Sequence, residues 1–88
     1  MDEQQKMAAM DDWLDQVCEA LDVDRALLSE VSPAILEMVG QIAHGPSRPG
    51  GPMTAMAIGL AIADQDDPVA AVHRAIAQVE ELLAEQDR

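Results

Sequence analysis

Residues 67–83 read DPVAAVHRAIAQVEELL, and this stretch decides the fold class. Asp67 and Pro68 form a helix start, because aspartate caps free amides and proline suits the first helical position. The apolar side chains that follow recur every three or four residues, at Val69, Val72, Ile76, Val79 and Leu83. The pattern predicts an amphipathic helix that either faces a core or forms the seam of a homodimer. Its short length, about two heptads, favours packing within one chain.

The preceding segment, from about Pro52 to Ala63, is apolar on every side. A helix without a polar face is normally buried, so we expect this one to be the most buried element, with Ile58 in the core. Its small residues Ala55 and Gly59 lie four positions apart. This spacing permits a neighbouring helix to approach closely.

The N-terminal part of the chain predicts a helix over residues 3–21. Its apolar face consists of Met7, Met10, Trp13, Leu14, Val17, Cys18 and Leu21. Acidic and polar side chains occupy the other faces, which indicates a solvated surface. Cys18 is the only cysteine, and its place on the apolar face predicts a small buried hydrophobe rather than a reactive thiol.

A short helical turn and a separate helix are expected between residues 25 and 43. The helix start is predicted at Ser32 and Pro33, a capping residue followed by proline. Gly45 is placed to end that helix. Three prolines and three glycines in residues 45–52 then predict a shaped, nonhelical connection.

Composition supports the same fold class. The 88 residues suit one domain, and 49% of them are hydrophobic with a single aromatic, Trp13, and no Phe or Tyr. Helix formers dominate while strand-favouring aromatics are absent. The sequence therefore predicts an all-α, single-domain bundle over residues 1–88, with four main helices plus a short helical turn.

The formal net charge of -12 restricts the possible partners. Nucleic acid is excluded as a ligand, because binding to phosphates requires clustered cations, and an anionic membrane surface would repel the chain. The polar, acidic start Met1-Asp2-Glu3 does not resemble a secretion signal. We therefore expect a cytoplasmic protein.

Acidic residues stop at Glu37 and resume at Asp64. Within this gap lies the Pro/Gly-rich loop, in which His44 and Arg48 stand alone as basic groups. The start of the next helix offers free amides and the positive end of a dipole, so His44, Arg48 and Thr54 are candidate ligand-binding residues for a phosphate or a carboxylate. The alternative interpretation is that the loop only turns the chain, with His44 and Arg48 as solubilising groups.

Catalysis has little support in the sequence. His44 has no nucleophile or orienting carboxylate at a recognisable spacing, and Ser47 belongs to no nucleophile motif. His73 lacks partners at metal-ligand spacing. We expect no catalytic residues, no metal and no cofactor, and the sequence favours a protein that is not an enzyme.

Several residues in this order resemble a known family. They are Trp13-Leu14, Ala43-His44-Gly45, Arg48-Pro49, Pro52, Thr54 and Gly59-Leu60. Over about residues 10–83 the chain resembles a small helical domain of unknown function from actinobacteria, found alone or attached to molybdopterin-guanine dinucleotide transferases. Gly50-Gly51 and Pro46 depart from the expected loop pattern, which puts the loop's shape in doubt. The family has no established binding residue to carry over.

This resemblance implies a setting in molybdenum cofactor biosynthesis. The sequence predicts a non-catalytic accessory or protein-interaction domain with a protein partner, the resemblance suggesting a molybdenum cofactor enzyme. Two alternatives stay open, namely a small anionic-ligand or nucleotide-binding module that uses residues 44–54, and a structural homodimer through the C-terminal helix. A monomer is favoured over the homodimer.

Overall fold

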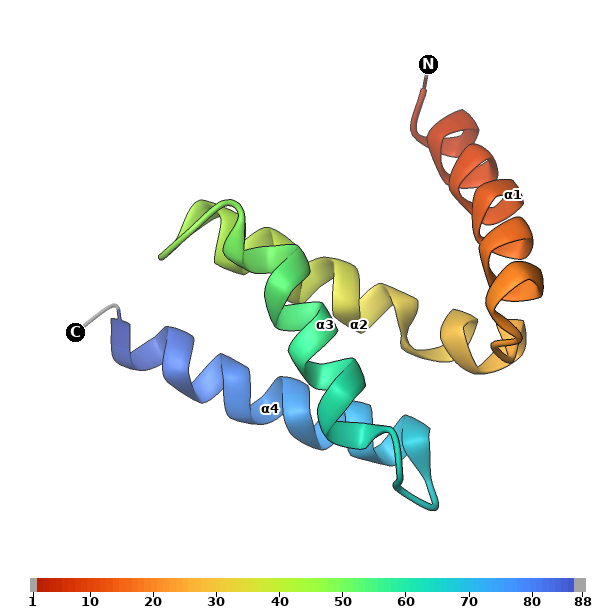
Figure 1. The fold of residues 1–88 in the computed structure, drawn as a ribbon. Coiled ribbons are helices and arrows are strands. Elements are labelled where there is room, and N and C mark those ends of the chain that lie inside the picture. Colours follow the sequence, from red (N-terminus) through yellow and green to blue (C-terminus); the bar gives the residue numbers. More distant parts are fainter. Residues whose placement is uncertain (1, 87–88) are drawn as a thin grey trace.

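The computed structural model describes residues 2–86, and all regular structure in this range is helical (Figure 1). Four helices follow one another: α1 Glu3–Leu21, α2 Arg25–His44, α3 Gly50–Ile62 and α4 Pro68–Gln86. The predicted all-α fold is confirmed. The first and last helices begin and end close to the expected positions, whereas the two middle helices begin earlier than predicted.

A capping aspartate stands directly before the first residue of three of the four helices. The Asp2 carboxylate accepts the Gln5 amide at 2.8 Å, and the Gln5 side chain accepts the Asp2 amide in return. Asp24 accepts two amides in the first turn of α2, and Asp67 accepts the Ala70 amide at 3.2 Å. Each carboxylate satisfies otherwise free donors at the positive end of a helix dipole. The helix start predicted at Asp67 is confirmed.

α2 continues through the place where a new helix was predicted to begin. Ser32 does not cap a helix, because its hydroxyl donates to the Leu28 carbonyl oxygen one turn earlier, at 2.7 Å. Pro33 therefore lies inside α2, where proline normally costs about 3 kcal/mol. The predicted short turn and separate helix from residue 33 are wrong. The buried side chains of α2 lie on both sides of Pro33, so the packed face extends across the proline and offsets its cost.

The core lies between α2, α3 and α4. Its buried members are Val31, Met38, Ile42, Ile58, Val72 and Ile76. Met38, on α2, is only 1% exposed. α2 packs against each of the other three helices, whereas α1 contacts α2 alone and projects away from the others (Figure 1). α2 is therefore the central element.

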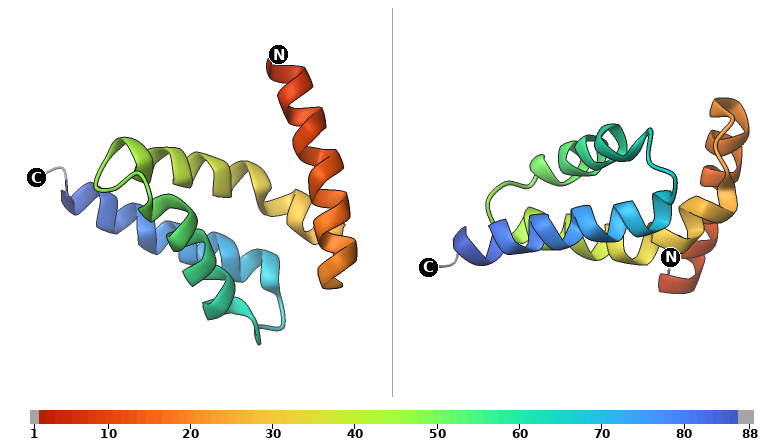
Figure 2. Two further views of the ribbon diagram at one scale, coloured as in Figure 1. Left: turned by 45° about the horizontal axis from the view of Figure 1, so that its top comes forward. Right: turned by 90° about the horizontal axis from the view of Figure 1, so that it is seen from below.

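The prediction that the all-apolar helix is the most buried element is wrong. α3 lies across the pair formed by α2 and α4 (Figure 2), so the chain covers only one of its sides. Gly51 and Ile58 are its only buried residues. Met53, Met56 and Leu60 are 68%, 58% and 68% exposed. We call these three residues the α3 outer face.

The apolar stripe of α4 is used within the chain. Val72 and Ile76 are 5% and 6% exposed, and Val69, Val79 and Leu83 pack against the same core. The expected packing inside one chain is confirmed. The side chains that would form the seam of a homodimer on this stripe are already covered within the chain.

The molecule is flat and open for its size. Its extents are 41 × 38 × 18 Å and its radius of gyration is 13.8 Å, compared with about 12 Å for a compact chain of this length. The accessible surface is 6402 Å², whereas a compact monomer of 9.4 kDa exposes about 5,000 Å². Six of the large apolar side chains that are exposed lie on α1 and α3, namely Met7, Trp13, Leu21, Met53, Met56 and Leu60.

Within residues 2–86, α2 is the one helix long and apolar enough to cross a membrane by length and composition. It also supplies the most buried side chain of the core, Met38. A core helix passes the same test as a membrane span; α2 packs on three other helices, and 17% of its apolar window is buried.

Candidate functional site

The loop between α2 and α3 is short and bonded to itself. The amides of Gly45 and Ser47 both donate to the Ile42 carbonyl oxygen, at 3.1 and 3.2 Å. The Gly50 amide donates to the Ser47 carbonyl at 3.1 Å and to its hydroxyl oxygen at 3.2 Å. The expected nonhelical connection over residues 45–52 is therefore shorter than predicted, since α3 already begins at Gly50.

The start of α3 presents fewer free donors than the sequence suggests. Pro49 occupies the cap position and makes no side-chain cap bond. The amides of Gly50 and Gly51 donate to Ser47 and Arg48, and Pro52 has no N–H. The anion site expected there therefore loses the donors of the first helical positions.

The three candidate ligand-binding residues occupy different surroundings. His44 and Arg48 are exposed, at the last residue of α2 and in the loop, respectively. Thr54 is partly buried, and its hydroxyl donates to the Gly50 carbonyl oxygen at 2.7 Å, so its proton is not available to a ligand. Ligand binding at His44, Arg48 and Thr54 stays a prediction.

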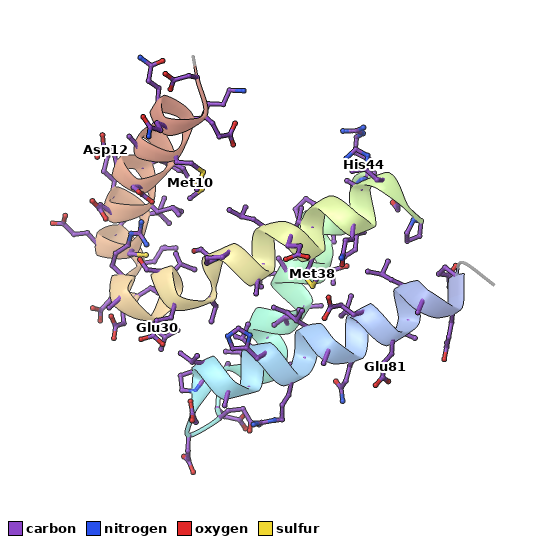
Figure 3. All side chains as sticks on the ribbon, turned by 180° about the vertical axis from the view of Figure 1, so that it is seen from behind. Met10, Asp12, Glu30, Met38, His44 and Glu81 are labelled. Carbon is purple, nitrogen blue, oxygen red and sulfur yellow. The ribbon has the colours of Figure 1, made fainter. Side chains whose placement is uncertain are left out.

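His44 lines a groove at the open end of the α2–α4 pair, and Figure 3 shows it at the end of its helix. The groove has a volume of about 640 Å³. Its lining consists of Gln41, His44, Gly45, Pro46, Glu80, Leu83, Ala84 and Gln86. Arg48 and Thr54 do not belong to this lining, so the structure does not gather the three candidates in one cavity.

A second groove lies between α1 and α2, with a volume of about 330 Å³. Its lining consists of Met7, Met10, Asp11, Arg25, Ser29, Ser32, Pro33 and Leu36. We call it the methionine groove. Met7 and Leu36 are 41% and 46% exposed, and Figure 3 shows Met10 on the side of α1 that faces α2. α1 thus carries an apolar stripe that α2 covers only at one end, near the buried Cys18.

Arg25 fixes the angle between the two helices at the closed end of this groove. Its Nε donates to Asp15 at 2.9 Å and its Nη2 to Asp11 at 3.2 Å. Its Nη1 donates to the Ser29 hydroxyl oxygen at 2.6 Å. The two aspartates are about 60% exposed, so each ion pair contributes about 0.2–1 kcal/mol. The Arg25 side chain is 25% exposed, and its guanidinium holds two α1 carboxylates at once.

Other sequence predictions can be checked at these surfaces. Cys18 is 4% exposed, which confirms that it is buried. His73 is exposed. In the described part of the chain, no three His, Cys, Asp or Glu side chains gather as metal ligands do. Sequence reasoning missed the methionine groove, although Met7 and Met10 were recognised as part of one apolar face.

The fold and these surfaces define a small all-helical domain with two open apolar faces. The chain belongs to the family described as a domain of unknown function, DUF6457, whose sequence profile matches residues 5–88. No curated protein and no solved structure matches the chain. The family assignment agrees with the predicted domain of unknown function.

Proposed function

We propose that this chain is a non-catalytic protein-interaction domain, and that the methionine groove binds a basic amphipathic helix of a partner protein. The observation that carries the proposal is the open groove itself, whose lining includes Met7, Met10 and Leu36 and one acidic residue, Asp11. A monomer that used α1 only for stability would fold its apolar stripe fully onto the core.

The side chains of the groove suit a helical ligand. Methionine is unbranched and polarisable, so Met7 and Met10 adapt to the ridges of different helices. An amphipathic helix that lays its apolar face into such a groove uses anchors three and four residues apart. Since α1 contacts only α2 and Arg25 holds the angle between these two helices, the groove is already open before a ligand binds.

Charge selects a basic partner. Asp11 lines the groove, Glu3 lies one turn before Met7, and Glu37 lies one turn after Pro33. Arg25 is the one basic residue in the lining, and it pairs with Asp11, the one acidic residue there, and with Asp15. The net charge of -12 would also accelerate the approach of a cationic segment.

The proposed setting is molybdenum cofactor biosynthesis in the cytoplasm, with a molybdopterin-guanine dinucleotide transferase as the partner. The resemblance of His44-Gly45, Arg48-Pro49 and Thr54 to an actinobacterial domain found alone or attached to such transferases supports this setting. A separately encoded copy would act as an accessory subunit that docks where an attached copy is covalently linked.

The setting is tested by capture of the transferase from the same cell on the immobilised chain. Met7→Lys places a cation in the groove and is expected to lower the affinity at least tenfold, since it repels a basic helix and removes an apolar anchor. Leu82→Lys is the matched control, because Leu82 is 59% exposed on α4 and lies outside both grooves. If the unmodified chain does not capture the transferase, the proposed role in molybdenum cofactor biosynthesis is wrong.

The groove is tested separately with a synthetic helix of lysine and leucine, against a peptide of the same composition with its apolar face scrambled. Trp13 is the only tryptophan and is 61% exposed on α1, so its emission reports on the surroundings of this helix. Only the amphipathic peptide is expected to shift the emission, and Met7→Lys is expected to abolish the shift. Equal responses to both peptides would show charge attraction without a docking groove.

The anionic-ligand alternative is supported by Arg48, which is exposed in a segment without acids. A charge-assisted bond from Arg48 contributes about 1.5–3 kcal/mol. Inorganic phosphate or GMP is the probe, and binding that Arg48→Ala weakens tenfold or more would favour this function over protein docking.

A further inference from the structure

The α3 outer face is an apolar surface that nothing in the chain covers. Met53, Met56 and Leu60 follow one another at three and four residues, so they form one stripe along the helix. Each is more than half exposed. The one hydroxyl of the helix, on Thr54, bonds back to the Gly50 carbonyl and gives this stripe no polar group. A helix without a polar face requires burial on more sides than α2 and α4 provide.

Charge indicates what covers this face. The chain carries 17 acidic and 5 basic residues, so two copies repel each other over most of their surfaces. The exception is the segment between Glu37 and Asp64, which includes all of α3 and has no acidic residue. A basic partner would find no carboxylate on α3 to pair with. A second copy would meet an α3 helix that carries no acidic residue of its own.

The symmetry of a dimer and the amount of exposed surface also favour a second copy of the chain as the partner on this face. A two-fold interface places one patch against itself, and an uncharged apolar stripe is complementary to its own copy. Gly59 is exposed, and a Cβ at this position would meet no atom within 4 Å, so a second helix can approach the backbone there. The surface of the whole molecule, with the open sides of both α1 and α3, exceeds that of a compact monomer by about 1,400 Å², and a standard interface removes about 800 Å² from each partner.

We infer that a second copy of this chain packs on the α3 outer face, so that the two α3 helices contact each other across a two-fold axis. This homodimer replaces the monomer that the sequence favours and differs from the dimer through the C-terminal helix. It leaves the methionine groove open on each copy, because that groove lies between α1 and α2. The inference is therefore independent of the proposed docking of a partner helix.

The test is the mass of the unmodified 88-residue chain in solution, by sedimentation equilibrium between 1 and about 100 µM. We expect twice the chain mass of 9.4 kDa at the upper concentrations. Met56→Glu and Leu60→Glu, made separately, are each expected to raise the dissociation constant of the dimer at least tenfold while circular dichroism stays unchanged. Leu82→Glu introduces the same charge at a leucine on α4 that is 59% exposed, close to the 58% of Met56, and is expected to leave the dimer intact.

Three results would overturn the inference. The first is a monomer of the unmodified chain at every concentration. The second is a dimer that resists both Met56→Glu and Leu60→Glu, and the third is dissociation of Leu82→Glu to the same extent as these two variants. Because both α3 positions are more than half exposed, an unfolded variant at either position would also contradict the arrangement.

Discussion

Gly51 determines how closely α3 lies against α2. A Cβ at this position would lie 2.8 Å from Val39 Cγ1 and 3.2 Å from the Val39 carbonyl oxygen. Neither atom can move freely, since one belongs to a β-branched side chain and the other to the helix backbone. Gly51→Ala is therefore expected to lower the free energy of unfolding by about 1–3 kcal/mol. Urea denaturation measures this change.

Gly40 provides the matched control in the helix that α3 packs against. A Cβ there would meet no atom within 4 Å, and the position lies in the interior of α2. Gly40→Ala should stabilise the chain by about 0.5–1 kcal/mol, because alanine restricts the unfolded chain and favours the helix. Equal stability of the two variants would show that Gly51 does not carry the close approach.

The proline inside α2 lowers the stability of the whole helix, so replacing it is expected to stabilise the chain. Pro33 is exposed, so replacing it removes no core packing, and Pro33→Ala restores a backbone donor to the helix. The gain is about 2 kcal/mol, from a penalty of about 3 kcal/mol for proline in a helix less about 1 kcal/mol for the greater freedom of the unfolded chain. Urea denaturation is the measurement. An unchanged or lower stability would indicate that the packing of α1 on α2 requires Pro33.

The same element shows why some helix starts could be predicted and others could not. Asp67-Pro68 and Ser32-Pro33 are the same kind of signal, yet only the first begins a helix. Asp67 follows the polar residues 64–66, so no apolar face extends across it. Ser32 follows the buried Val31, whose face continues to Met38, and a continuous packed face outweighs a local signal.

At the scale of the whole molecule, the sequence predicts which helices are amphipathic but not which sides remain open. For α3, the all-apolar composition predicts burial on every side, whereas its position across α2 and α4 covers only one side. The methionine groove could not be predicted for the same reason, because it depends on the angle at which Arg25 holds α1 against α2. The loop could be predicted only in part: Pro46 and Arg48 lie in the connection, whereas His44 ends α2 and Gly50, Gly51 and Pro52 already belong to α3.

The charge of the whole molecule leads to a prediction about salt. Folding brings 17 acidic and 5 basic residues into a body 18 Å thick, and two like charges 10 Å apart repel by about 0.4 kcal/mol in water. Salt weakens this repulsion, since the screening length falls to about 10 Å at 0.1 M. It also weakens the two ion pairs of Arg25, but each contributes at most about 1 kcal/mol and the like charges far outnumber these pairs.

Raising NaCl from 20 to 500 mM is therefore expected to stabilise the chain by about 1 kcal/mol, which corresponds to about 4–8 °C in Tm for a domain of this size. Thermal melts at one fixed protein concentration measure the shift, because a dimer would make Tm depend on concentration. Arg25→Met is the matched control. It lacks the pairs that salt weakens, so its Tm should rise at least as much as that of the unmodified chain. A fall in Tm with salt would mean that the attractions held by Arg25 outweigh the repulsion among the acidic residues.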